Sequence, residues 1–293
     1  MTDTSSHLRE VHVQADIERL QCWLQKQPHL PRDIDDKVLE AFVTGTKSLE
    51  IAKNKLDSYY TIRGKVPQLF DFNSRDPLKP AFQDASKSFS MFFLPKPTPE
   101  GYRVLMMRLE QEFSTFSHQQ KIVRTMMMIE LAMSTWPEMK GIIFCYDMKY
   151  APGNLLSRLS LSFGAMSIHW FQSSVPMKMK RGIFINAPSF MSIIVNKIAK
   201  PFLSEKVFDR IVISTNGEET IKRKYVPTEL LPSDYGGEEK SSDLLNEYWL
   251  EVLVEKRDWF MKTSGQTADE NKRPPDSSDA YGVEGTFRSL SFD

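Results

Sequence analysis

The stretch that decides the fold reads PMKMKRGIFINAPSFMSIIVNKIAKPFLSEKVFDRI and spans residues 176–211. Residues 181–186 read RGIFIN and predict a buried strand. Residues 190–202 are dense in Phe, Met, Ile and Val at helical spacing, and a proline marks their end. Another apolar run follows at 209–215. Strand, helix and strand in this order predict parallel pairing within an α/β domain.

The same alternation extends toward the N-terminus. Residues 102–110 and 140–148 predict two more strands, and residues 117–135 predict a helix between them. Residues 152–174 predict a helix with a proline near its start. Residues 8–66 differ, because their apolar positions recur at helical spacing between caps and helix-ending Gly and Pro. They predict a helical module.

The sequence therefore predicts an all-helical N-terminal module followed by an α/β domain. We place the module at 8–80 and the α/β domain at 90–240. A closing amphipathic helix follows at 241–262. Residues 263–293 begin with a polar, proline-containing stretch, which predicts a mostly flexible tail.

The overall charge is balanced, with 38 Lys plus Arg against 38 Asp plus Glu in 293 residues. A neutral chain has no general attraction for nucleic acid, but a local excess of basic residues between Lys178 and Lys224 suits an anionic surface. The N-terminus lacks the apolar core of a signal peptide, and no run reaches the roughly 18 apolar residues of a spanning helix. Cys22 and Cys145 form no CxxC or metal spacing, so they predict buried free thiols and a cytoplasmic protein.

Motifs for catalysis are absent from the sequence. It contains no GxSxG, no GxGxxG after a strand, no P-loop and no HExxH. His169 lies in an apolar predicted helix and indicates packing, while Asp147 ends a predicted core strand and indicates a partner for loop amides. We expect no enzymatic activity, no metal and no cofactor. An enzyme with a nonstandard site at His169 or Asp147 is the alternative.

The predicted helix at 190–202 has an apolar arc that covers about half of its circumference. Lys and Arg residues precede and follow it in the sequence. An apolar helix with a basic rim is typical of reversible binding to an anionic bilayer, and a wide apolar arc also suits the cover of a cavity. The simpler alternative is a surface helix packed on a sheet.

Four stretches together resemble the CRAL-TRIO family of lipid-transfer proteins. Residues 176–211 are similar to the segment that contains the family's mobile gate helix. LLPSDYGGEE (230–239) resembles the signature LP-x-E-Y-G-G, with Asp234 in place of Glu. GIIFCYDM (141–148) resembles a strand that usually reads GI-x-x-I-x-D, and AKNKLDSYYTIRGKVPQLF (52–70) resembles the end of the helical module. The α-tocopherol transfer protein and cellular retinaldehyde-binding protein branch is nearest, and the tail YGVEGTFRSLSFD resembles insect members.

This resemblance implies an α/β domain whose mixed sheet forms the floor of a lipid cavity that a gate helix closes. It implies a monomeric carrier that moves a retinoid, tocopherol, carotenoid or phospholipid between membranes and docks transiently on phosphoinositides. A phosphoinositide-sensing adaptor without obligatory lipid transport is the alternative.

The resemblance also assigns residues to three sets. The gate positions are Phe190, Ile194, Ile198 and Phe202. The phosphoinositide positions are Arg63, Lys178, Arg181, Lys206 and Arg210, and Lys180 is able to share the role of its neighbours. The cavity-lining positions are Ile122, Thr125, Ile129, Ile142, Tyr146, Trp170, Phe171, Val175, Ile183, Met191 and Val195. His169 and Gln172 are expected as polar groups near that wall.

Overall fold

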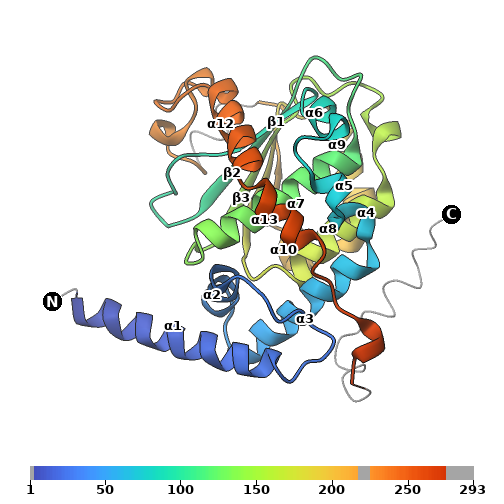
Figure 1. Cartoon of the computed structure of the whole chain (residues 1–293). Helices are drawn as coiled ribbons and strands as arrows, with labels where there is room; N and C mark the ends of the chain where they lie inside the picture. The colour runs from blue at the N-terminus through green and yellow to red at the C-terminus, as the bar shows by residue number, and fades with distance from the viewer. Residues whose placement is uncertain (1–2, 217–224, 275–293) are drawn as a thin grey trace.

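The computed structural model describes residues 3–216 and 225–274 of the chain (Figure 1). Helices come first in the sequence. They are α1 (Asp3–Leu24), α2 (Asp36–Gly45), α3 (Leu49–Lys65), α4 (Pro67–Phe70), α5 (Phe72–Arg75) and α6 (Pro80–Ala85). Their buried apolar side chains join those of the following domain in one hydrophobic core. The predicted helical module is therefore present and packs directly on the rest of the molecule.

A single mixed sheet organises the rest of the described chain. Its strands are β1 (Phe89–Phe93), β2 (Arg103–Leu109), β3 (Ile142–Asp147), β4 (Met179–Ile185) and β5 (Ile211–Ile213). They lie side by side in sequence order, with β1 antiparallel to β2 and every other neighbouring pair parallel. The α/β fold with a helical N-terminus and a mixed sheet is thus confirmed.

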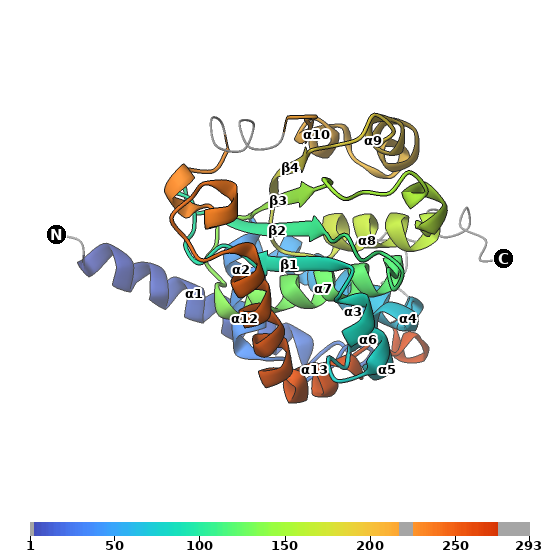
Figure 2. The same ribbon diagram turned by 90° about the horizontal axis from the view of Figure 1, so that it is seen from above.

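Helices cover this sheet and close its edges. Those after β2 are α7 (His118–Thr135), η1 (Leu155–Arg158), α8 (Leu161–Ser173), α9 (Met191–Ile193), η2 (Ile194–Ala199), η3 (Lys200–Phe202), α10 (Glu205–Phe208), η4 (Thr228–Leu230), η5 (Ser233–Tyr235), α12 (Ser242–Glu255), α13 (Arg257–Ser264) and η6 (Glu270–Lys272). Figure 2 shows α9 and α10 beyond β4 on one side of the sheet, and α12 beside β1 on the other.

Local sequence explains most of these boundaries. Ser117 caps α7 by accepting a hydrogen bond from the backbone of Gln120, and Ser160 does the same for α8. This second cap explains why the predicted helix 152–174 is a short 3₁₀ turn followed by a later α-helix. The closing helix also divides, into α12 and α13, at Lys256. Cys145 is buried, but Cys22 is exposed on α1, so its predicted burial is wrong.

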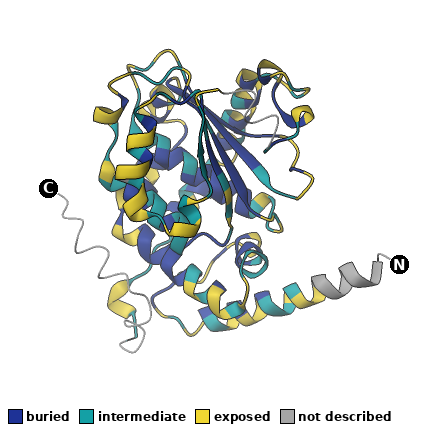
Figure 3. Ribbon diagram, turned by 180° about the vertical axis from the view of Figure 1, so that it is seen from behind, coloured by how far each residue is buried: buried dark blue, intermediate teal, exposed yellow. Residues whose placement is uncertain are grey.

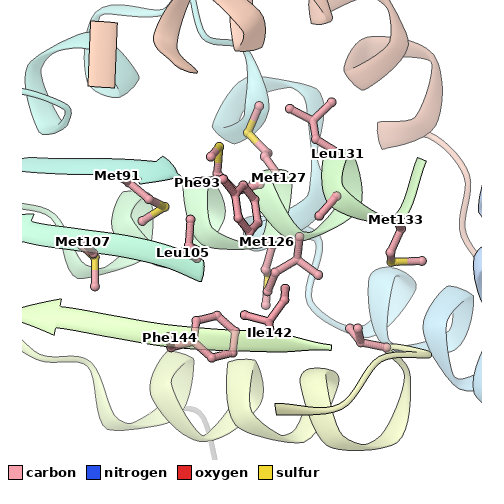
Figure 4. Close-up of a cluster of buried hydrophobic side chains, with 14 of the residues drawn as sticks. Met91, Phe93, Leu105, Met107, Met126, Met127, Leu131, Met133, Ile142 and Phe144 are labelled. Carbon is pink, nitrogen blue, oxygen red and sulfur yellow. The ribbon is translucent and has the colours of Figure 1, made fainter. Parts of the chain in front are cut away.

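The core lies between α7 and one face of the sheet (Figure 4). Residues at alternate positions of the strands share this face and meet the apolar side of α7, because side chains alternate along a strand and recur each turn along a helix. The labelled members are Met91, Phe93, Leu105, Met107, Met126, Met127, Leu131, Met133, Ile142 and Phe144. Burial is high across β1, β2 and β3 (Figure 3), as their apolar runs predict.

The beginning of the predicted tail is packed against the helical module. The backbone N–H of Ala268 donates to the carbonyl of Tyr60 at 3.0 Å. Arg273 donates through Nη2 to Asp57 Oδ1 at 2.9 Å, and Asp57 Oδ2 also lies 2.8 Å from His29 Nε2. The predicted flexibility is therefore wrong for residues up to 274, while the prediction for 275–293 lies outside the described residues.

Candidate functional site

An apolar cavity of about 310 Å³ lies between the sheet, α7, α8 and the chain that joins β4 to β5. Its volume falls in the range of about 300–1,000 Å³ that is typical of small-molecule sites. The core passes directly into it, since Met107, Met126 and Phe144 belong to the core and also line the cavity. Methionine side chains adapt to ligands of irregular shape.

Aromatic rings form the sheet side of this cavity. Tyr146 stacks on Phe184 with 4.8 Å between ring centroids, and this pair joins the adjacent parallel strands β3 and β4. Phe144 meets Phe171 of α8 edge to face at 5.4 Å. These contacts between aromatic rings fix the arrangement of the cavity floor.

The predicted gate, which is called the gate below, is the segment 191–202; it consists of α9, η2 and η3 and lies between the parallel strands β4 and β5. It occupies nearly the predicted span, but η2 is a π-helix and η3 is a 3₁₀ turn rather than a continuation of α9. A π-helix is rare and frequently marks a functional position. Met191, Ile194 and Val195 line the cavity from this segment.

Gln172 of α8 forms hydrogen bonds with the backbone at the C-terminal end of the gate. Its Nε2 donates to the carbonyl of Phe202 at 2.9 Å, and its Oε1 accepts from the backbone of Ser204 at 3.1 Å. Both ends of one side-chain amide therefore bind the backbone where the gate finishes. This arrangement fixes the gate over the cavity through two hydrogen bonds near the surface.

The outer side of the gate exposes large apolar side chains among lysines. Ile193 is 49% exposed and Phe202 is 38% exposed, so both are among the large apolar side chains that the fold leaves at the surface. Lys197 and Lys200 are exposed on the same segment. The gate therefore presents apolar groups both to the cavity and to the exterior, as the wide apolar arc predicts.

The cavity wall carries polar groups at the start of α7. His118, Lys121 and Thr125 all line the cavity. Burial lowers the pKa of Lys121 to about 8. Burial and the neighbouring Lys121 charge lower the pKa of His118 to about 3, against a hydrogen bond from Ser160. His118 is therefore neutral at pH 7, whereas Lys121 still carries its proton for most of the time.

Asp147 lines the cavity, but its carboxylate already accepts hydrogen bonds from other residues of the protein. It accepts hydrogen bonds from the hydroxyl of Tyr235 at 2.5 Å, Asn186 Nδ2 at 2.8 Å and the backbone of Lys149 at 2.9 Å. These donors satisfy a carboxylate at the end of β3, as the sequence predicts. No group of three or more His, Cys, Asp or Glu in the described ranges has a metal-binding arrangement.

Eight of the residues predicted to line the cavity lie on its wall. They are Ile122, Thr125, Ile129, Tyr146, Trp170, Phe171, Met191 and Val195. Three others do not, and these assignments are corrected. Ile183 pairs with Cys145 and faces the other side of the sheet, because side chains alternate along β4. Ile142 lies deeper in the core (Figure 4), and Val175 is buried beyond the end of α8.

Sequence reasoning missed His118 and Lys121. The signal was available, because they lie one turn before Ile122 and Thr125 on the same face of a predicted helix. His169, expected near the wall, is not among the lining residues, whereas Gln172 is.

The predicted gate residues take different positions. Ile194 lines the cavity, Phe190 packs partly buried against the core, and Phe202 is exposed. The side chain of Ile198 lies outside what the structure describes.

The basic positions meet where β4 and β5 begin. Lys178 and Lys206 are exposed. Arg181 lies over the ring of Tyr225 at 5.5 Å, and Arg210 donates to the carbonyl of Met179, so both are partly engaged. Lys178 and Lys206 are therefore the most accessible cations of the predicted set.

Arg63 does not belong to this group, and its assignment is corrected. Its side chain is buried, with Nη1 bound to Glu130 Oε1 at 2.6 Å. Its remaining nitrogens donate to the carbonyls of Thr263 and Gln266. Arg75 binds the other oxygen of the same Glu130. Arg63 thus joins α3, α7 and the chain after α13, and no membrane lipid reaches it in this arrangement.

Comparisons with known proteins agree with this geometry. A sequence model of the CRAL/TRIO domain matches residues 88–237, and one described as a Pinta-like UBA domain matches residues 9–82. The chain belongs to the CRAL/TRIO domain family, whose members bind and transfer lipids.

Individual relatives are more distant. Patellin-4 from Arabidopsis thaliana is 32% identical over 119 residues, which are 39% of this chain and 21% of Patellin-4. A crystal structure of Sfh5 matches with a TM-score of 0.40 and 13% identity, over 60% of this chain and 63% of that one. The chain thus spans about a fifth of the length of Patellin-4. No helix in the described part of the chain is long and apolar enough to cross a membrane.

Proposed function

We propose that this protein binds a hydrophobic small molecule in the cavity and transfers it between membranes without catalysing a reaction. The observation that carries the proposal is the gate, which covers an apolar cavity and also exposes Ile193 and Phe202 to the exterior. Retinoids, tocopherols, carotenoids and phospholipids are the ligand classes to test first. The resemblance to the tocopherol and retinaldehyde branch supports this choice.

The physical chemistry of lipids supports a carrier with a gate. A lipid exposes several hundred Å² of apolar surface, so at about 25 cal/mol/Å² its burial contributes on the order of 10 kcal/mol before the entropy of binding is subtracted. Such a ligand leaves readily only when another apolar phase receives it. A gate that inserts shallowly into a bilayer would couple the opening of the cavity to contact with the receiving membrane.

Transient docking at the cytoplasmic surface of membranes belongs to the same proposal. Lys178 and Lys206 lie exposed near the start of β4 and β5, and each basic residue near an anionic surface contributes about 1 kcal/mol. Phosphoinositides are the proposed docking lipids. They would favour the open gate only if they bind the open state more tightly than the closed one.

A transfer assay tests the carrier function. Fluorescent retinoid, tocopherol and phospholipid probes are supplied in donor vesicles, and their arrival in acceptor vesicles is followed with and without protein. We expect faster transfer of at least one probe, and a slower rate for Ile193→Asp than for the control Lys47→Met, since Lys47 is exposed on the helical module. No acceleration for any probe would contradict the carrier function.

Vesicle sedimentation tests the docking step. The double variant Lys178→Ala with Lys206→Ala is compared with Lys47→Ala on vesicles containing phosphatidylinositol bisphosphate. Loss of two cations is expected to weaken binding about tenfold or more. Equal binding by both variants would remove these residues from the docking surface. Docking without transfer of any lipid would favour the alternative of a phosphoinositide-sensing adaptor.

A further inference from the structure

A lysine ammonium group stands in the wall of the apolar cavity. Lys121 lies in the first turn of α7, three residues after His118, so both side chains leave the helix on the face that lines the cavity. The ammonium lies 5.1 Å from the centre of the Tyr146 ring. Since the start of an 18-residue helix carries partial positive charge, this end of the cavity is electropositive.

Another half-buried lysine, Lys55, shows how the fold satisfies such a group elsewhere. Lys55 donates to the carbonyls of Gln172 at 2.8 Å and Val175 at 2.9 Å, outside the cavity. Lys121 has no ion pair or hydrogen bond from its ammonium to any residue of the described ranges. Among the described residues, its ammonium contacts the face of the Tyr146 ring. Lys121 is half-buried, and a partly desolvated cation without an anion or acceptor is unfavourable, so an anion beside Lys121 would stabilise it.

The carboxylate of the cavity does not supply the missing partner. Asp147 accepts from Tyr235, Asn186 and the backbone of Lys149. Desolvation is the sole influence on the pKa of Lys121, with no contribution from a nearby acid. No acidic side chain of the described residues pairs with Lys121, so a ligand that brings an anion would complete this site.

His118 adds a neutral donor beside the cation. Its Nδ1 accepts a hydrogen bond from the backbone N–H of Ser160 at 2.9 Å. In a neutral imidazole the other nitrogen then carries the proton, so Nε2 is the donor. Thr125 offers no further donor to the ligand, since its hydroxyl already donates to the carbonyl of Lys121.

We propose that the cavity selects an amphipathic lipid with a carboxylate head, which pairs with Lys121 and accepts a hydrogen bond from His118 Nε2. This inference rests on the proposed carrier function and names its ligand class. One ammonium and one neutral donor match the single charge and two oxygens of a carboxylate. A phosphate monoester carries more charge, and the described lining holds no arginine and no second lysine to meet it.

Three ligands with the same hydrocarbon chain and different head groups test which head group the cavity binds. Oleic acid, oleyl alcohol and oleyl phosphate are titrated at pH 7 into wild type, Lys121→Met and the control Lys47→Met, with tryptophan fluorescence as the readout because Trp170 lies in the wall. Wild type and the control are expected to bind the acid at least about tenfold more tightly than the alcohol. Lys121→Met is expected to lose this preference while it binds the alcohol as well as wild type does, which also shows that the variant is folded.

The other outcomes separate the two proposals. Equal binding of acid and alcohol by wild type, or an unchanged preference in Lys121→Met, overturns the carboxylate site and leaves the carrier function standing. Tighter binding of oleyl phosphate than of oleic acid overturns the carboxylate in favour of a phosphate head. Binding of none of the three ligands overturns this inference, and failure of the vesicle transfer assay would overturn the carrier function separately.

Discussion

Replacement of Lys121 by methionine is expected to stabilise the ligand-free protein. Methionine keeps the length of the side chain and has a similar helix propensity, but it carries no charge. Burial lowers the pKa of Lys121 from 10.5 to about 8. At about 1.36 kcal/mol for each pKa unit, this difference sets an upper limit of about 3 kcal/mol on the gain. The lost contact with Tyr146 offsets about 0.5–2 kcal/mol, so the free energy of unfolding should rise by about 1–2 kcal/mol at pH 7.

The pH dependence of this gain gives a second check. A lysine whose pKa is lowered by folding destabilises the protein fully below the folded-state pKa, and the penalty disappears as the pH rises toward the unfolded-state value. The advantage of Lys121→Met should therefore be complete at pH 7 and should fall by half or more at pH 9.5. Lys47→Met should show no such trend, because Lys47 is exposed.

Urea unfolding of the ligand-free proteins at both pH values measures these differences, and a constant m value shows that the comparison is valid. A less stable Lys121→Met at pH 7, or an advantage that does not change with pH, would refute the reasoning. Either result would mean that the ammonium already has a favourable partner inside the protein.

Three further changes give clear expectations. Gln172→Met removes two hydrogen bonds to the end of the gate and should raise the ligand dissociation rate about 5- to 100-fold in stopped-flow fluorescence, with little change in the melting temperature. Arg63→Ala removes one of the two arginines that bind the buried Glu130 and leaves the carbonyls of Thr263 and Gln266 without their side-chain donor. It should lower the free energy of unfolding by about 2–5 kcal/mol, without a selective loss of vesicle binding by the folded fraction. Asp57→Asn should weaken the contact with Arg273 and speed hydrogen exchange near the C-terminal end of the described chain; unchanged exchange would contradict this.

Acid should weaken the contact between Asp57 and Arg273, which Asp57→Asn also weakens. Burial raises the pKa of Asp57, but hydrogen bonds from His29 and Arg273 overcome this effect and lower it below 3.8. A carboxylate with a lowered pKa stabilises the fold above its unfolded-state value and loses that contribution as the pH falls through the folded-state pKa. The difference between wild type and Asp57→Asn should therefore be present at pH 7, begin to fall near pH 3.8 and vanish only below the lower folded-state pKa.

The order of elements was predictable because it depends on local patterns. Continuous apolar runs at β2, β3 and β4 stand out against their polar flanks, and the spacing along α7 marks a helix. The strand β1 was not predicted. Its sequence FSMFF is short, and its antiparallel edge position follows from pairing with β2 rather than from any local signal.

The lining residues were predicted from the family resemblance, and side-chain direction explains which of them line the cavity. Those on α7 share one face of the helix that lines the cavity. Ile183 points to the other side of the sheet, because a one-residue difference on a strand reverses the direction of the side chain. The family resemblance placed Arg63 among the phosphoinositide positions, but its burial beside Glu130 depends on segments far apart in the sequence. Such contacts are tertiary, so no local pattern reports them.

Native mass spectrometry of the purified protein, followed by lipid extraction, tests the central claim most directly. We predict that each protein molecule carries one lipid, which adds the mass of that lipid to the protein and is lost on mild activation. Lipid extraction should recover about one lipid molecule for each protein molecule. Filling the cavity with a bulky side chain, as in Thr125→Trp, should abolish this adduct, since Thr125 lines the cavity. Protein that carries no lipid after purification, and takes up none from a broad panel of lipid vesicles, would contradict the account.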